Sequence, residues 1–244
     1  MPFRMFINRL RPGSVAAASI PQVTVTSIPD VAPGSDCRDA FRAAYENRYT
    51  WEPGFGGYRG RCIWEQGDRR VEGRFQIGAD LKAKVEGVDD AEVEKAIASQ
   101  LWEVAIHRVR RSFDQVHGAN TFTAGDSTDE GLEVLIGGKG EGDRYRIKGD
   151  VVTMVHRHIH GTVVTIHTGS TTDTGSGYLS RDYSSQYADP ASGEEKGPSS
   201  QFEDTFVPLG EQGSWVLERR AIRSKDSDGS DTLQVFQFTD LTAL

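Results

Sequence analysis

From Tyr58 to the C-terminus, hydrophobic and polar residues alternate with a period of two in one segment after another. In residues 58–65, Tyr58, Cys62 and Trp64 fall on one side of the chain, and the arginines and Glu65 fall on the other. Such alternation is typical of antiparallel strands with one buried face and one face in water. It predicts strands at 58–65, 71–77, 81–86, 132–136, 144–159, 162–168, 177–187, 201–207, 214–223 and 232–239.

Two segments have hydrophobic residues at helical spacing instead. The first predicted helix covers residues 36–50. It begins at Ser35 or Asp36, either of which can cap a helix, and it stops before Pro53. Residues 89–113 begin at Asp89 with an acid three residues later, and their basic end suits the helix dipole. Gly118 follows as a predicted left-handed cap.

Roughly ten strands and two helices predict an α+β fold, in which a large curved antiparallel sheet packs on the two helices. We expect a single β-rich domain over residues 35–244. Residues 1–34 contain five prolines and show no sustained periodicity. They predict a disordered or targeting N-terminal tail.

The formal net charge is −8, and residues 1–29 carry three arginines and no acid, so the rest of the chain is more acidic still. Nucleic acid is excluded as a partner, because phosphate binding depends on Lys and Arg. No segment approaches the roughly 20 apolar residues that span a bilayer. Two cysteines, Cys37 and Cys62, are too few for a disulfide framework, although a single bridge stays open. We expect a cytoplasmic protein, or a plastid protein if the basic start is a transit peptide.

Several short motifs carry a family resemblance. They are AYENRYTW at 44–51, GFGGY at 54–58, HGAN at 117–120, DTGSGY at 173–178 and FEDTF at 202–206. From about residue 36 onward the chain resembles a domain-of-unknown-function family common in cyanobacteria and photosynthetic eukaryotes. That family implies no activity. The order of elements also resembles the LolA-type lipoprotein carrier architecture, a half-barrel that holds an acyl chain, and this resemblance is one of fold alone.

Four of the six histidines lie between residues 156 and 167. A hairpin turn at His160-Gly161 would place His156, His158 and His167 on one face. Three imidazoles on one face predict a Zn²⁺, Cu²⁺ or Fe²⁺ site, to which Glu203 or Asp204 could add a carboxylate. The alternative is a polar strand face in water.

Aromatic residues concentrate in the first half of the chain, where most belong in the core. Those at the end of the first helix and after it are predicted to line the mouth of an apolar cleft, with polar residues beside them. The candidate ligand-binding residues are Tyr45, Arg48, Tyr49, Trp51, Phe55 and Tyr58. The favoured function is binding of a hydrophobic or amphipathic small molecule, such as a lipid, isoprenoid or pigment. A metal-dependent enzyme built on the histidines and a structural or assembly protein that recruits a protein partner are the alternatives.

Overall fold

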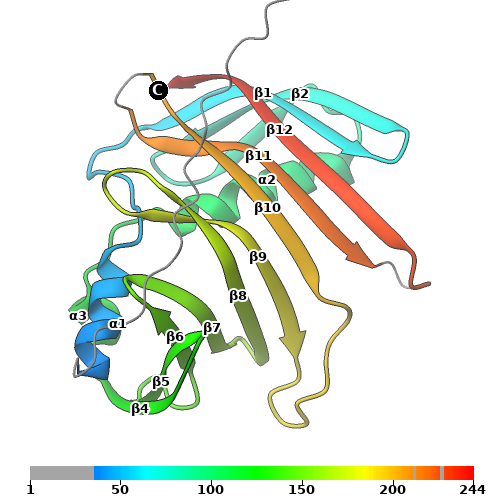
Figure 1. The fold of residues 1–244 in the computed structure, drawn as a ribbon. Coiled ribbons are helices and arrows are strands. Elements are labelled where there is room, and N and C mark those ends of the chain that lie inside the picture. Colours follow the sequence, from blue (N-terminus) through cyan, green and yellow to red (C-terminus); the bar gives the residue numbers. More distant parts are fainter. Residues whose placement is uncertain (1–35, 211–212, 226–227) are drawn as a thin grey trace, which may run out of the picture.

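The computed structural model describes residues 36–210, 213–225 and 228–244, and the predicted tail at 1–34 lies outside them. In these residues one twelve-stranded sheet is accompanied by three helices, α1 (Cys37–Glu46), α2 (Ala91–Ile106) and α3 (Phe113–His117) (Figure 1). The strands are β1 (Gly57–Gln66), β2 (Arg69–Gly78), β3 (Ala83–Glu86), β4 (Asn120–Thr128), β5 (Gly131–Gly138), β6 (Arg144–Lys148), β7 (Val151–Ile159), β8 (Thr162–Asp173), β9 (Tyr178–Ala188), β10 (Ser200–Pro208), β11 (Trp215–Lys225) and β12 (Asp231–Ala243).

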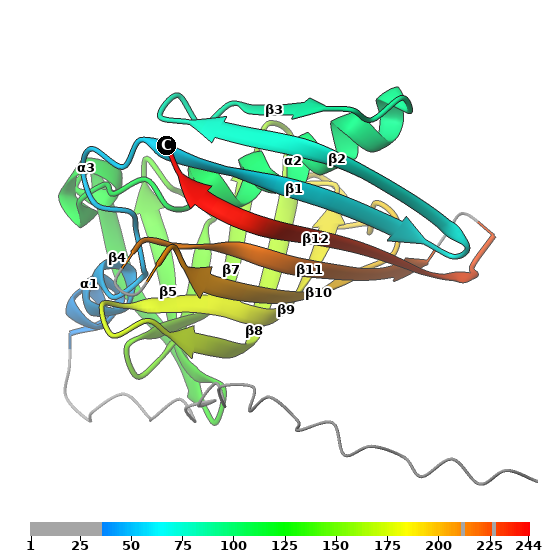
Figure 2. The same ribbon diagram turned by 90° about the horizontal axis from the view of Figure 1, so that it is seen from above.

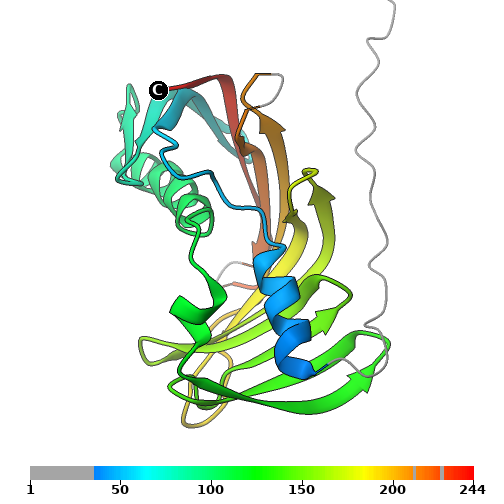
Figure 3. The same cartoon turned by 90° about the vertical axis from the view of Figure 1, so that its left-hand side faces the viewer.

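The sheet is an antiparallel meander that returns to its own beginning. Strands β4 to β12 are neighbours in chain order, and β12 then pairs with β1, with Cys62 opposite Phe238. The order is therefore β3-β2-β1-β12-β11-β10-β9-β8-β7-β6-β5-β4, with β3 and β4 as unpaired edges. Figures 2 and 3 show the sheet bent into an arc, with the helices on its inner side. We call this the concave face and the opposite side the convex face. The prediction of a large curved antiparallel sheet in an α+β fold is confirmed.

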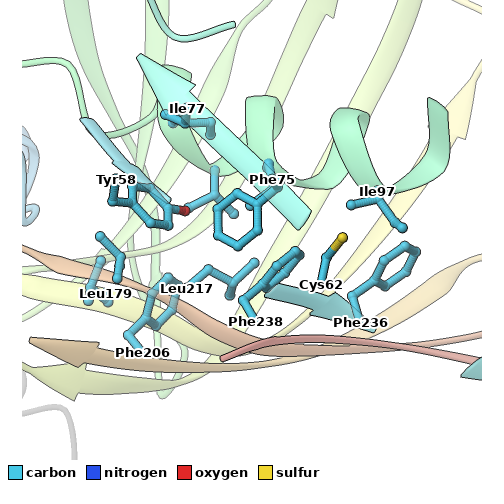
Figure 4. Close-up of a cluster of buried hydrophobic side chains, with 14 of the residues drawn as sticks. Tyr58, Cys62, Phe75, Ile77, Ile97, Leu179, Phe206, Leu217, Phe236 and Phe238 are labelled. Atoms are coloured by element: carbon cyan, nitrogen blue, oxygen red, sulfur yellow. The ribbon is translucent and has the colours of Figure 1, made fainter. Parts of the chain in front are cut away.

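Two hydrophobic clusters hold the helices on the concave face. Near one end of the arc, Val93, Ile97 and Leu101 of α2 pack on the aromatic side chains of β1, β2 and β12 (Figure 4). Near the other end, Phe41 of α1 and Phe113 of α3 pack on β5, β6 and β7. Each fully buried side chain of this size contributes about 1.5–3 kcal/mol. The two ends of the arc are thus the stable parts of the concave face.

The predicted second helix, 89–113, is wrong at both ends. Asp90, not Asp89, caps α2 by accepting hydrogen bonds from two backbone N–H groups. The helix stops at Ile106, where the backbone N–H groups of His107 and Arg108 bond to the carbonyls three residues back, at Val104 and Ala105. The carbonyl of Arg108 then accepts from the backbone N–H of Trp51 at 2.8 Å instead of from a further helical turn. α3 is a separate helix, and the predicted left-handed cap is also wrong, since Gly118 has φ −61°.

The number of strands was also underestimated. β4 was missed because its polar, partly exposed sequence and its irregular pairing between Ala124 and Ser127 disguise the alternation. The predicted strand 144–159 is the hairpin β6–β7, which turns at Gly149 with φ +54°. No helix among the described residues combines the length and apolar character needed to cross a membrane. Cys37 and Cys62 are both free thiols, so the bridge left open does not form.

Candidate functional site

The segment that joins α1 to β1 crosses the concave face, and we call residues 47–51 the strap. Tyr178 of β9 donates its backbone N–H to the carbonyl of Asn47 at 2.9 Å and accepts one from Tyr49 at 2.8 Å. The bond from Trp51 to Arg108 ties the far end of the strap to the segment that directly follows α2. In Figure 3 the strap runs up from α1 on the inner side of the arc. Two motifs distant in sequence, AYENRYTW and DTGSGY, therefore meet here.

Gly177 makes this approach possible. Its φ is +131°, and a Cβ at this position would lie 2.6 Å from the carbonyl oxygen of Asn47. A side chain would fit neither the backbone conformation nor the space. The glycine of DTGSGY that precedes Tyr178 is thus explained by the contact between the strap and β9.

Most of the predicted ligand-binding residues are buried in the clusters. Tyr49, Trp51 and Tyr58 are 6%, 6% and 0% exposed, and Phe55 is partly buried against them. The hydroxyl of Tyr49 accepts a hydrogen bond from the backbone N–H of Trp215 at 2.9 Å. The indole N–H of Trp51 donates to the backbone carbonyl of the same residue, also at 2.9 Å. These side chains anchor the strap to β11 rather than standing at an open mouth.

Tyr45 and Arg48 lie at the other end of the strap. Tyr45 is partly buried against the α1 cluster, and the guanidinium carbon of Arg48 lies 3.8 Å from the centroid of its ring. Arg48 also donates from Nε to the carbonyl oxygen of Tyr45 at 2.9 Å. A ligand-binding role for the six predicted residues stays a prediction, and Arg48 is the charged residue among them.

Arg108, which belongs to the basic end of the predicted second helix, lies beside the strap. Its Nη1 donates to the carbonyl oxygen of Tyr49 at 3.2 Å, and its guanidinium carbon lies 5.5 Å from the ring centroid of Phe206. Its Nε is buried and has no hydrogen-bond partner in the described part of the chain. Among the described residues, the hydroxyl of Tyr58 is likewise buried without a hydrogen-bond partner.

Two further arginines approach the same region from the sheet. Arg157 of β7 pairs with Asp143 at 3.1 Å, and Arg220 of β11 pairs with Asp204 at 2.7 Å. The positive charges of all four arginines act on His107, which follows α2. The pKa of His107 is lowered to about 4, mainly by desolvation and then by the charges of Arg108, Arg48, Arg220 and Arg157, in that order. His107 is therefore neutral at pH 7. In the sequence, the only sign of this group of arginines was the position of His107 and Arg108 in the basic end of the predicted second helix.

Between the two hydrophobic clusters the concave face is accessible. Tyr187 of β9 is 48% exposed and Ile159 of β7 is 40% exposed. The cross-strand pairs Arg157–Val164 and Val164–Tyr187 place Tyr187 on the same face as Arg157. Ile159 lies on that face as well, because it is two residues from Arg157 in β7. Glu103 of α2 acts on Tyr187, whose pKa is raised first by burial and then by this carboxylate. Apolar and aromatic surface therefore adjoins the arginine cluster.

The β7–β8 hairpin has the predicted register, and the side chains of His156, His158 and His167 lie on the convex face of the sheet. His158 is opposite Val163, His156 opposite Thr165 and Met154 opposite His167. The ring centroids of His156 and His158 are 5.8 Å apart. Nδ1 of His156 lies 2.9 Å from the hydroxyl of Thr165, and Nδ1 of His158 lies 3.5 Å from a carboxylate oxygen of Asp143. In the part of the chain that the structure describes, no three His, Cys, Asp or Glu side chains are grouped to hold a metal ion. The Zn, Cu or Fe site stays a prediction.

His167 also lines a shallow groove of about 390 Å³ on the convex face, which the predicted carboxylate Glu203 lines as well. The second predicted carboxylate cannot contribute there. Asp204 follows Glu203 in β10 and so points to the concave side, where it is 2% exposed and bonded to Arg220. The alternation of side chains along a strand explains this correction.

Comparison with known proteins places the chain in a family. No functionally curated protein matches it. A LolA superfamily protein from Nitrosomonas europaea shares 11% identity, with a TM-score of 0.33 over 86% of this chain and 94% of that one. A chain of the Pseudomonas aeruginosa MucA/MucB complex shares 9% identity, with a TM-score of 0.23 over 83% and 93%. At these TM-scores neither likeness supports a conclusion about function.

A family model described as a protein of unknown function, DUF3386, matches residues 32–244. This confirms the predicted membership of a domain-of-unknown-function family, whereas the predicted distribution among photosynthetic organisms stays a prediction. Because the match covers most of the sequence, the chain belongs to the DUF3386 family of proteins of unknown function.

Proposed function

We propose that this protein binds a hydrophobic or amphipathic small molecule, such as a lipid or an isoprenoid, on the concave face of its sheet. The observation that carries the proposal is the accessible apolar surface between the two hydrophobic clusters. Ile159 and Tyr187 are 40% and 48% exposed there, beside the partly buried Val155 and Ile166. Ligand sites are typically concave, apolar and edged by a few polar groups.

The packing of α2 supports a preformed site. Arg220 bonds at once to Asp204 in β10, Tyr183 in β9 and Gln100 in α2, at 2.7–2.8 Å. This network fixes the distance between α2 and the sheet at the edge of the accessible surface. A preformed wall lowers the conformational cost of binding, because little has to be ordered when the ligand arrives.

Two measurements test the proposal. Native mass spectrometry and solvent extraction of the purified protein are expected to find a bound apolar molecule. Nile red, a neutral hydrophobic dye, is expected to gain fluorescence when added to protein stripped of ligand. Tyr187→Asp should abolish this gain, because it places a charge in the apolar surface.

The matched control is Leu233→Asp. Leu233 of β12 is 41% exposed and pairs with Arg223, so it lies on the convex face. This variant is expected to keep the dye response. A protein that is purified empty and does not bind the dye, or equal loss of dye binding in both variants, would contradict a concave ligand site.

A further inference from the structure

The two arginines at the strap lack a carboxylate partner, although the chain as a whole is acidic. Arg157 and Arg220 each pair with an aspartate, but no ion pair joins Arg48 or Arg108 to an acid within residues 36–210, 213–225 and 228–244. The chain carries 36 acidic and 28 basic residues, so carboxylates are in excess. A cation in a protein interior is expected to be paired, because burial without a partner is unfavourable.

Backbone carbonyls position both guanidinium groups but accept only a few of their N–H donors. Arg48 gives one N–H to Tyr45 and Arg108 gives one to Tyr49. A guanidinium has five N–H donors in a fixed fork, which suits the paired oxygens of a carboxylate or a phosphate. Both arginines therefore keep donors that an anion could accept from.

Two buried polar atoms mark the same place. The Nε of Arg108 and the hydroxyl of Tyr58 are inaccessible and have no partner among the described residues. Both residues adjoin Trp51 of the strap: its backbone N–H bonds to the carbonyl of Arg108, and its ring centroid lies 6.1 Å from that of Tyr58. Buried polar groups in native proteins almost always have hydrogen-bond partners, so each exception requires an explanation.

We infer that the polar end of the ligand is an anion, a carboxylate or a phosphate, and that Arg48 and Arg108 hold it at the strap beside Tyr58. This inference rests on the proposed function and names the chemical class of the ligand. The apolar part then extends from the strap toward Ile159 and Tyr187. Burial lowers the pKa of Arg108 to about 10, so its guanidinium is still charged at pH 7 and available to an anion.

The experiment compares ligands that share one chain and differ at one end. Hexadecanoate, hexadecyl phosphate and hexadecanol are titrated into ligand-stripped protein by calorimetry, with inorganic phosphate as a fourth ligand. Hexadecanoate or hexadecyl phosphate is expected to bind about tenfold or more tightly than hexadecanol, the size of effect that charge-assisted hydrogen bonds give. Binding of inorganic phosphate alone would identify a phosphate site and overturn the amphipathic ligand.

Arg48→Gln is expected to remove this preference for the anion and to leave the affinity for hexadecanol unchanged. The matched control is Arg61→Gln, at a half-exposed arginine of β1 that pairs with Glu72 away from the concave face. It should bind all the ligands as the original protein does. Loss of the anion preference in both variants would overturn the inference.

A second readout needs no variant. Because the positive charges around His107 contribute to its low pKa, a bound anion is expected to raise that pKa in an NMR titration. Hexadecanol should leave it unchanged. If acid and alcohol bind equally and His107 does not respond, the anion inference is wrong while the proposed function stands. If neither ligand binds, the proposed function itself fails.

Discussion

Arg220 and Asp204 form a two-pronged ion pair inside the protein, with Nε to Oδ1 at 2.8 Å and Nη2 to Oδ2 at 2.7 Å. Both side chains are only 2% exposed. Tyr183 bonds to both of them, and Gln100 accepts from the remaining nitrogen of Arg220. The pair is tolerated at this depth because every prong has a partner, and through it α2 is tied to the middle of the sheet.

Removing one member of this pair is expected to destabilise the protein strongly. Asp204→Ala removes the buried counter-charge of Arg220 and leaves only the half-exposed Glu103, at 3.3 Å, to pair with it. Removing one partner costs about 3–5 kcal/mol in comparable buried pairs. Urea unfolding followed by circular dichroism measures it. The control is Asp231→Ala at the exposed pair with Lys225, where we expect less than about 1 kcal/mol. Similar losses in the two variants would show that the buried pair is not a structural tie.

Gly177→Ala is expected to destabilise the strap and to weaken ligand binding as well. A methyl group there meets the backbone of Asn47 and Tyr49, and the φ of +131° is unfavourable for alanine. We expect a loss of about 2 kcal/mol or more in thermal or urea unfolding. The control, Gly175→Ala, also has a positive φ but meets no atom within 4 Å. This variant measures the cost in stability of a positive φ for alanine without any steric clash. An equal effect of both substitutions would mean that the close approach of the strap is unimportant.

His117 is expected to make stability depend on pH. Burial, followed by the charges of Arg157 and Arg48, lowers its pKa from 6.5 to about 4. As the pH falls below about 6.5 the unfolded chain takes up this proton before the folded one does, so stability decreases between about pH 6.5 and about pH 4. His117→Gln should flatten this decrease, measured by urea unfolding at several pH values. His160→Gln, in the exposed hairpin turn, should leave it in place. A slope that is the same in all three proteins would contradict the assignment.

The histidine hairpin provides a test of the metal prediction. Three imidazoles on one ion would retain Zn²⁺, Cu²⁺ or Fe²⁺ through gel filtration, because neutral ring nitrogens are good ligands for these metals. If His156, His158 and His167 form a site, elemental analysis after metal supplementation finds about one equivalent, and His158→Ala loses it. His160→Ala, at the turn, should retain it. Retention of far less than one equivalent by the original protein would exclude the site.

Local patterns along the chain were sufficient for the type of fold. The alternation at Tyr58, Cys62 and Trp64 marks which side of β1 is buried, because the side-chain period of a strand is a property of its backbone. The turn at His160-Gly161 and the pairing of His158 with Val163 followed from turn chemistry in the same way. Where the alternation was weak, as in the partly exposed edge strand β4, the prediction failed.

The candidate site depended on tertiary structure. The sequence marked Arg48 by its motif, but it could not show that Arg48 and Arg108, 60 positions apart, meet at one strap while Arg157 and Arg220 arrive from two strands. It also placed Tyr49, Trp51 and Tyr58 at an open mouth, whereas packing against α2 and β11 buried them. Sequence periodicity reports which side of an element is apolar. Which elements then face one another is decided by how the whole sheet bends and where the helices pack on it, and that determines which charges gather and which aromatic residues become core.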